Sequence, residues 1–335
     1  MDQHNRVVRF GAAVILWAVA ARLAAGGFFQ PLLDRFSQPN TQAFLIYLET
    51  GRNVRFSPSM EAFSESVGES PGPQIPQSAP ETLRPVFSSG DLELVDILYA
   101  CSLRPDNEAL LAAPLTWDLT GDTPRVLILH THTTESYTQS GESYQESSAF
   151  RTLDESYNML SIGQRVAQRL QEAGICVIQD RSFHDYPSYN GSYNHARKEI
   201  LRILRENPGI QLILDLHRDA SGDLNNQFRP VASVEGQDTA QIMLVMGTNA
   251  AGLDHPHWEQ NLSLGLKLQA QLERQAPGIT RPISLRSQRF NQDLSPGALL
   301  IEMGAAGNTH AEALRAADQL ARAIIALSRG TQSEE

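Results

Sequence analysis

The stretch VLILHTHTTES, residues 126–136, is the part of the sequence that decides the fold. Four apolar residues are followed at once by two histidines and a glutamate in a polar segment. A continuous apolar run of this length is typical of a strand buried on both faces, as in a sheet covered by helices on each side. The stretch therefore predicts an α/β protein with candidate functional side chains where a strand ends at its carboxyl edge.

The same pattern continues along the chain, where short apolar runs alternate with longer segments whose apolar residues recur every three or four positions. This alternation is typical of strands and amphipathic helices in an α/β domain. Thr309 and Glu312 have the spacing of a helix capping box. We expect a covered, mostly parallel sheet with helices on both faces. The expected strands are 126–129, 175–178, 211–216, 242–246 and 298–302, and the expected helices are 156–173, 193–205, 258–275 and 309–327.

The domain organisation follows from shifts in composition. Residues 123–330 are expected to form the catalytic α/β domain. Fourteen of the 29 residues in 57–85 are Pro, Ser or Gly, which is typical of a flexible linker. This linker lies within an accessory region, 31–122, whose apolar clusters at 44–48 and 91–101 suggest short helices.

Residues 1–30 are expected to be a membrane anchor. Residues 10–21 are uncharged, and apolar residues resume after Arg22. The uncharged run spans only about 18 Å as a helix against a hydrocarbon core of about 30 Å, so the expectation requires Arg22 to snorkel outward. Basic residues before the run then place the rest of the chain outside the cytoplasm. An uncleaved anchor is favoured over a cleaved signal peptide or a buried core helix.

Composition excludes several classes of function. The formal net charge of −11 disfavours nucleic-acid binding, which requires a basic face to neutralise phosphates. The two cysteines cannot form a Cys-rich zinc site, so any metal must be held by histidines and carboxylates. The sequence has no HExxH and no Gly-rich phosphate loop, which removes the usual marks of thermolysin-like and nucleotide-dependent classes.

His130, His132 and Glu135 form the first candidate cluster. In an extended chain the two histidines project to the same side, and the turn that follows can bring Glu135 back to them. Two imidazoles and a carboxylate are suitable ligands for a catalytic zinc, which takes three protein ligands and leaves one position open. Surface histidines in a polar loop are the alternative interpretation.

His217 ends the expected strand 211–216. Neighbouring strand ends lie about 5 Å apart, so His217 can share one ion with the first cluster. Asp215 or Asp219 would fix the tautomer of a ligand histidine, unless either residue caps the next segment. A purely structural histidine is the alternative.

Glu302 closes the otherwise apolar strand 298–302. A carboxylate in such a strand is costly unless it is paired, hydrogen-bonded or used as a proton acceptor. Beside a zinc ion it would act as the general base of amide hydrolysis. A salt bridge to an arginine is the alternative.

Five blocks of the sequence together resemble stage II sporulation protein P of endospore-forming bacteria, over roughly residues 123–327. They occur in the family's order and read LILHTHTTESY (127–137), HDYPSYNGSYNHARK (184–198), ENPGIQLILDLHRDA (206–220), VMGTNAAGLDHPHWEQNL (245–262) and FNQDLSPGALLIEMGAAGNTHAEAL (290–314). The resemblance implies a fold like that of zinc-dependent N-acetylmuramoyl-L-alanine amidases.

The resemblance also implies an activity and a setting. The enzyme would be a peptidoglycan hydrolase that cuts the bond between the lactyl group of N-acetylmuramic acid and L-alanine, with endopeptidase activity on peptide cross-links. It would thin the septal wall during engulfment, in the intermembrane space. Its partners would be a lytic transglycosylase, stage II sporulation protein D, and other membrane-anchored engulfment proteins.

By position, the resemblance implies Zn²⁺ bound by His130, Glu135 and His217, with His132 as the alternative to His130 and Glu302 as the general base. Amidase relatives often take their metal glutamate from the start of the following helix, where this chain has Asp154 and Glu155. The aromatic segment 186–193 is a candidate lining of the glycan groove, with an ordinary loop as the alternative.

Two other functions are compatible with the same residues. One is a zinc carboxypeptidase or deacetylase that acts on another cell-wall substrate. The other is a catalytically inactive wall-binding scaffold, which the strand carboxylate Glu302 disfavours.

Overall fold

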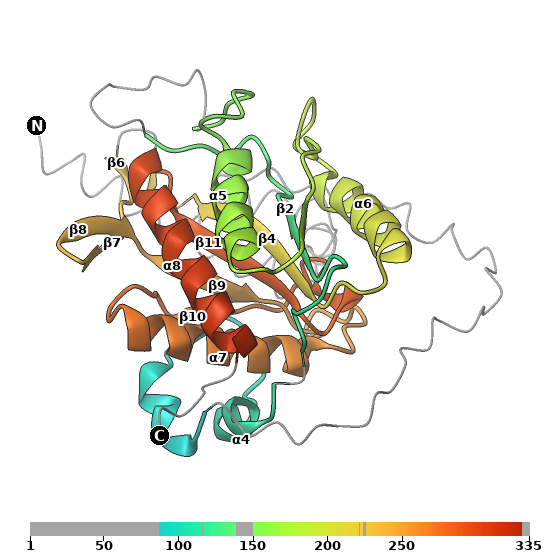
Figure 1. Cartoon of the computed structure of the whole chain (residues 1–335), viewed down its shortest axis with the longest axis vertical. Coiled ribbons are helices and arrows are strands. Elements are labelled where there is room, and N and C mark those ends of the chain that lie inside the picture. Colours follow the sequence, from blue (N-terminus) through green and yellow to red (C-terminus); the bar gives the residue numbers. More distant parts are fainter. Residues whose placement is uncertain (1–86, 116, 139–149, 221, 224–225, 330–335) are drawn as a thin grey trace, which may run out of the picture. The chain divides into compact units, whose positions relative to one another are not determined.

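A seven-stranded sheet forms the centre of the structure, which is a computed structural model (Figure 1). The structure describes residues 87–115, 117–138, 150–220, 222–223 and 226–329, all of which belong to the unit Gln77–Glu335. The strand order is β1-β10-β9-β11-β4-β2-β3. The strands are β1 (Ile97–Tyr99), β2 (Val126–Leu129), β3 (Val177–Gln179), β4 (Leu212–Asp219), β9 (Ile242–Met246), β10 (Ile283–Leu285) and β11 (Ala298–Ala305).

All neighbouring strands in this sheet run parallel except β9 and β11, which are antiparallel. The carboxyl ends of β2, β4 and β11 therefore lie at the same edge of the sheet. The expected mostly parallel α/β fold is confirmed. Two small antiparallel hairpins accompany the sheet, β5–β6 (Gly222–Asp223 and Asn226–Gln227) and β7–β8 (Val231–Val234 and Gln237–Ala240).

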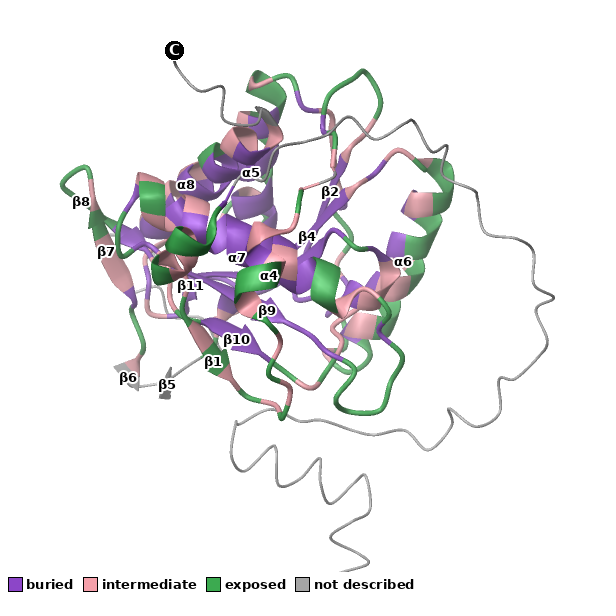
Figure 2. Ribbon diagram, turned by 90° about the horizontal axis from the view of Figure 1, so that it is seen from below, coloured by how far each residue is buried: buried purple, intermediate pink, exposed green. Residues whose placement is uncertain are grey.

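Helices cover both faces of the sheet. On one face, α5 (Met159–Glu172), α7 (Trp258–Gln275) and α8 (His310–Arg329) share a large apolar cluster with the strands. On the other, α6 (Ser192–Glu206) packs against β2 and β4 through a smaller cluster. Figure 2 shows β2 and β4 between α5 on one side and α6 on the other. We call these sides the core face and the α6 face.

Local sequence explains where the helices begin and end. The side chain of Asn158 accepts a hydrogen bond from the Leu160 N–H and so caps the start of α5. The capping box expected at α8 is confirmed, because the Thr309 N–H donates to Glu312 and the Glu312 N–H donates to the Thr309 hydroxyl, each at 3.2 Å. The expected strands and helices after residue 123 are all present. Two of the strands and one of the helices also have the expected bounds.

The prediction of a short helix at 91–101 is wrong in part. A 3-10 helix, Ser89–Leu94, is followed by the edge strand β1, which pairs in parallel with β10. Leu98 is 61% exposed between two half-buried neighbours, which is the period-two pattern of a strand. A short apolar run does not distinguish a strand from a helix by its periodicity, and pairing with β10 decides the outcome.

Residues 87–122 pack onto the same fold as the residues that follow them. The short helix α4 (Asn107–Ala112) lies against α7, where the buried Lys267 ammonium donates to the Leu110 carbonyl at 2.7 Å and to the Ser263 hydroxyl at 2.8 Å. The predicted division between an accessory region 31–122 and a catalytic domain stays a prediction. The linker 57–85 and the cluster 44–48 lie outside the described residues.

The predicted localisation, membrane-anchored by one N-terminal segment, needs correction. In the described part of the chain, no helix is both long enough and apolar enough to cross a membrane. The segment on which the prediction depended, residues 1–30, lies outside the described residues. The physical weakness of that prediction is the uncharged run 10–21, which spans about 18 Å as a helix and falls short of a bilayer core of about 30 Å.

Candidate active site

The candidate site lies on the α6 face, where β2, β4 and β11 end. Side chains alternate along β4, so that Leu214 and Leu216 join the core face while His217 points the other way. The ring of His217 lies parallel to that of Tyr193 on α6, with 6.5 Å between centroids. In the parallel pairing of β4 with β11, His217 is directly beside Glu302.

His217 is held between two carboxylates. Its Nε2 atom lies 2.9 Å from Asp215 Oδ1, and its Nδ1 atom lies 3.6 Å from Glu135 Oε2. Burial opposes protonation, but the two carboxylates outweigh burial and raise the pKa of His217 well above its usual value. Asp215 is fixed in turn by Thr131, whose N–H donates at 2.8 Å and whose hydroxyl donates at 2.6 Å. Of the two aspartates considered from sequence, Asp215 is therefore the partner of His217.

Glu135 reaches the site from the turn after β2. It is 2% exposed and accepts a hydrogen bond from the Arg218 N–H at 3.2 Å. Arg151 Nη2 donates to its other oxygen at 3.3 Å. Burial alone would raise the pKa of Glu135, but the interaction with His217 and the nearby arginines lower it well below the usual value. Glu135 is thus an ionised carboxylate beside His217.

His132 lies on the same side as His217. Its ring is stacked on Tyr189 at 4.4 Å and meets the ring of His217 edge-on at 5.2 Å. The Tyr189 hydroxyl lies 3.1 Å from His132 Nε2, while Nδ1 is buried without a hydrogen-bond partner among the described residues. Burial lowers the pKa of His132 to about 3, so the ring is neutral and able to act as a metal ligand.

His130 lies elsewhere, which corrects the expectation that it projects to the same side as His132. Its Nδ1 atom is 3.1 Å from the Leu216 carbonyl, and its Nε2 atom is 3.3 Å from the Gln179 amide. A Cβ atom on Gly163 of α5 would come within 2.4 Å of its ring, so His130 packs tightly into the core face. The strand ends at Leu129 and residues 131–134 form a turn, so the alternation of an extended chain no longer holds. The structure brings His132, and not His130, to His217 and Glu135.

Glu302 completes the group from β11. It is 9% exposed, and it lies beside His217 on β4 and opposite Met243 on β9. Paired residues on adjacent strands lie about 5 Å apart and point to the same face. A glutamate in this position can reach a substrate or water held next to His217. Its predicted role as general base stays a prediction.

The donor set suits zinc in its chemistry. Two N or O ligands of one tetrahedral zinc lie roughly 3.4 Å apart, close to the 3.6 Å between Glu135 Oε2 and His217 Nδ1. The unpartnered Nδ1 of His132 provides a third donor nearby. As the side chains stand, no three His, Cys, Asp or Glu residues within the described ranges are arranged to hold a metal ion. Zinc binding by His132, Glu135 and His217 would therefore require these side chains to rearrange.

The alternative carboxylates at the start of the next helix point elsewhere. Asp154 accepts a hydrogen bond from the Ser156 N–H, and Glu155 forms an ion pair with Arg181 on the surface. Of the aromatic segment 186–193, Tyr189 is in contact with His132, whereas Tyr186 is 55% exposed.

Sequence reasoning missed the charged residues that support these groups. Arg151 pairs with Asp185 at 2.6 Å and with Glu135, and its guanidinium lies 4.7 Å from the centre of the Tyr189 ring. Asp185 also accepts a hydrogen bond from the Thr134 hydroxyl at 2.6 Å. The only available sequence signals were an arginine and an aspartate in polar segments, which are common features of surface loops.

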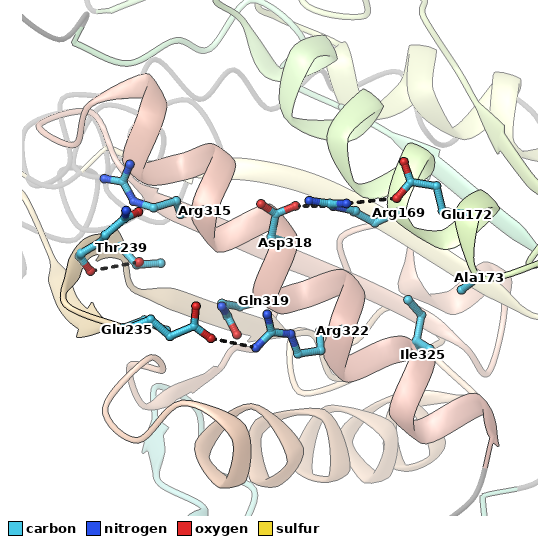
Figure 3. Close-up of a pocket in the computed structure, with 12 residues that line it drawn as sticks. Arg169, Glu172, Ala173, Glu235, Thr239, Arg315, Asp318, Gln319, Arg322 and Ile325 are labelled. Carbon is cyan, nitrogen blue, oxygen red and sulfur yellow. Dashed lines mark hydrogen bonds and ion pairs between the residues drawn. The ribbon is translucent and has the colours of Figure 1, made fainter.

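A hollow of about 630 Å³ lies away from these residues, between α5, α8 and the β7–β8 hairpin (Figure 3). Its lining contains arginines that already have acidic or carbonyl partners. Arg169 pairs with Asp318, and Arg322 pairs with Glu235. The lining includes none of the candidate site residues, so this hollow is separate from the site.

Comparisons with known proteins agree with the earlier resemblance. The family model described as stage II sporulation protein P matches residues 69–325. Stage II sporulation protein P of Bacillus subtilis (strain 168) is 28% identical over 215 residues, which are 60% of this chain and 50% of that protein. The chain thus spans about half the length of this curated relative.

Solved structures of amidases are similar at a lower level. N-acetylmuramoyl-L-alanine amidase AmiC2 of Nostoc punctiforme is 15% identical with a TM-score of 0.36, over 61% of this chain and 97% of that chain. The CwlD amidase from Clostridioides difficile, solved in complex with the GerS lipoprotein, is also 15% identical with a TM-score of 0.36, over 61% of this chain and 96% of that chain. Such values do not establish a shared activity. The family match, by contrast, covers more than half of the sequence, and the chain belongs to the stage II sporulation protein P family.

Proposed function

We propose that this chain is a zinc-dependent peptidoglycan hydrolase that acts during sporulation. Its reaction would be hydrolysis of the amide bond between the lactyl group of N-acetylmuramic acid and L-alanine. The observation that carries the proposal is the position of His217, which lies between Asp215 and Glu135 and directly beside Glu302. Membership in the stage II sporulation protein P family supports the choice of substrate.

His132, Glu135 and His217 would hold the metal ion. Bound zinc supplies Lewis acidity, which polarises the amide carbonyl and makes water a better nucleophile. Asp215 contributes by fixing the orientation of the His217 ring, as carboxylates commonly do for ligand histidines. Burial of the ligands excludes bulk water and strengthens their electrostatic interactions.

Glu302 would move the proton. As water attacks the amide carbon, the carboxylate of Glu302 accepts one proton from it, and the C–N bond then breaks. The same proton passes to the leaving nitrogen of L-alanine. The products are a free lactyl carboxylate and a free amino terminus, and one water molecule is consumed for each bond that is cleaved.

The proposal extends to a second activity and to partners. Endopeptidase cleavage of peptide cross-links would use the same group of residues on a second amide. A lytic transglycosylase of the stage II sporulation protein D type, together with membrane-anchored engulfment proteins, would act on the same peptidoglycan. Residues 123–330 with the packed segment 87–122 would form the catalytic unit.

Digestion of purified sacculi, followed by mass spectrometry of the products, tests the proposal. The zinc-loaded protein should release peptides that begin with L-alanine and leave glycan strands with free lactyl groups. Loss of cross-linked peptides would report the endopeptidase activity. A chelated sample should lose the activity and keep its circular dichroism spectrum. Release of only a terminal amino acid or acetate would favour a carboxypeptidase or deacetylase, and unchanged sacculi would favour a scaffold.

A further inference from the structure

Arg281 lies at the edge of the candidate site and has no role in the proposed reaction. Its Nη2 atom donates to Asp219 Oδ2 at 2.6 Å and lies 2.9 Å from the sulfur of Met243. Asp219 is two residues beyond His217 on β4, and Met243 is the cross-strand partner of Glu302 on β9. Since β11 lies between β4 and β9, the guanidinium spans the strand that carries Glu302.

One end of this guanidinium is without an acceptor. Nη1 of Arg281 is buried and has no hydrogen-bond partner among the described residues. The side chain as a whole is only 15% exposed, so water has little access to it. A buried donor that makes no hydrogen bond is costly, especially when it is charged. The arrangement is therefore incomplete as it stands.

The group that Nη1 lacks is a hydrogen-bond acceptor with a negative charge. A guanidinium is planar and offers parallel donors that match a carboxylate better than any other common anion in peptides. Asp219 already occupies Nη2, which fixes the plane of the group and orients Nη1. Such an oriented, half-occupied arginine is suited to recognise one further carboxylate.

We propose that Arg281 binds a carboxylate on the peptide side of the scissile amide and so makes the enzyme select stem peptides with a free carboxylate over amidated ones. This inference rests on the proposed function. The guanidinium is one strand away from Glu302, and its partner Asp219 is two residues beyond His217 along β4. With about 3.5 Å per extended residue, the carboxylate would lie one or two residues from the cleaved bond.

The ring of Phe228 lies beside the Arg281 guanidinium. The Arg281 guanidinium lies 5.3 Å from the centre of the Phe228 ring, and Phe228 is 45% exposed. Its backbone is held, since the Phe228 carbonyl accepts a hydrogen bond from the Gly307 N–H at 3.1 Å. A half-exposed side chain changes rotamer within nanoseconds, so the ring can move aside while the backbone stays in place.

Two soluble muramyl peptides that differ only in one group test the inference. One has a free carboxylate on the second peptide residue, and the other has a carboxamide there. The zinc-loaded wild-type protein should cleave the carboxylate peptide with a kcat/KM about 10 to 100 times higher, as expected for a charge-assisted pair. Arg281→Gln should remove this preference and leave the rate on the carboxamide peptide within about threefold.

Matched variants separate recognition from a structural role. Arg286→Gln changes an exposed arginine whose Nε donates to the Ser284 hydroxyl, and it should keep the full preference. Asp219→Asn removes the ion pair but keeps the Arg281 guanidinium, so it should retain a preference for the carboxylate. Phe228→Ala removes the ring that lies beside the Arg281 guanidinium and should strengthen binding of the carboxylate peptide. Arg281→Lys should restore part of the preference.

A binding measurement keeps this inference independent of the proposed activity. Calorimetry of each peptide with Glu302→Gln reports recognition without turnover, and the carboxylate peptide should bind at least tenfold more tightly. If the wild-type protein cleaves neither peptide, the proposed reaction is wrong, and the calorimetry still decides the role of Arg281. Equal affinities for both peptides, or an unchanged preference in a folded Arg281→Gln, would overturn it.

Discussion

Adjacent residues of β4 point into two different environments. Leu216 lies in the core face, within the apolar cluster shared by α5, α7 and α8. His217 lies in the α6 face, where its neighbours are the carboxylates Asp215 and Glu135. Both residues are almost fully buried, at 0% and 3% exposure. Burial alone therefore does not distinguish a core residue from a site residue, and the chemistry of the neighbours does.

The difference teaches how one sheet supports a stable core and a polar site together. Because side chains alternate along a strand, the same strand can supply leucines to one face and titratable groups to the other. The helix-rich core face provides most of the apolar burial. The α6 face has smaller apolar clusters and can hold the buried charges of Asp215 and Glu135, because both carboxylates are hydrogen-bonded.

The largest effects are expected from the pair Leu216 and His217. His217→Ala should abolish hydrolysis and zinc binding. It leaves the two carboxylates of Asp215 and Glu135 buried without the imidazole that lies between them, so the metal-free protein should lose about 3–5 kcal/mol of unfolding free energy. Leu216→Ala should lose about 2–5 kcal/mol through a core cavity and keep its zinc affinity. Denaturant titration and zinc titration compare the two, and normal zinc binding by His217→Ala would break the comparison.

Glu302→Gln should give the next largest effect. The substitution keeps the size and hydrogen-bonding reach of the side chain but removes the proton acceptor. General-base catalysis typically contributes about 10²–10⁴ in rate, so kcat should fall by at least about 10². Zinc content and thermal stability should stay near wild type. Loss of zinc would make Glu302 a ligand, and loss of stability alone would make it a structural ion-pair residue.

Substitution of the two histidines after β2 tests which of them binds zinc, and the expected effects are smaller than those above. His132→Ala should weaken zinc binding at least about 10- to 100-fold, because it removes one of three proposed ligands and this loss is typical even for residues that only orient a ligand. His130→Ala should leave zinc affinity unchanged and cost about 1–3 kcal/mol of stability, because the Leu216 carbonyl loses its contact with the ring. Zinc affinity and stability should be measured on both variants. The reverse pattern would place His130 at the metal.

A buried cation beside the core face should affect stability alone. Burial lowers the pKa of Lys267 to about 8 in the folded protein, from about 10.5 in the unfolded chain. Between these values the unfolded chain binds more protons, so unfolding free energy should rise with pH from about 8 to 10.5, on the order of 2–3 kcal/mol. Lys267→Met should flatten this rise. An unchanged slope in the variant would assign the pH dependence to other groups.

Periodicity predicted most of the fold. The helix 258–275 and the strands 126–129 and 242–246 have the predicted bounds, since long amphipathic patterns and fully apolar runs are strong signals. The segment 91–101 was mispredicted because the pairing of β1 with β10, nearly two hundred residues away, decides its structure. Such long-range pairing leaves little trace in a short apolar run.

The proximity of the candidate residues was predictable in part, but the direction of each side chain was not. The strand ends predicted that His217 and Glu302 lie close together, and they are paired in the sheet, because parallel strands bring their carboxyl ends together. The direction of His130 was not predictable, because it depends on where β2 gives way to a turn. The contacts of Arg151 and Arg281 join segments that are distant in sequence, so no local sequence pattern predicts them.

Anomalous scattering at the zinc edge, from crystals of the zinc-loaded protein, tests the central claim most directly. One strong peak is expected on the α6 face, at about 2.0–2.2 Å from a nitrogen of His132, a nitrogen of His217 and an oxygen of Glu135. Glu302 should lie near the peak without touching it. A peak bound by His130, or no peak at these residues at saturating zinc, would contradict the proposed zinc site.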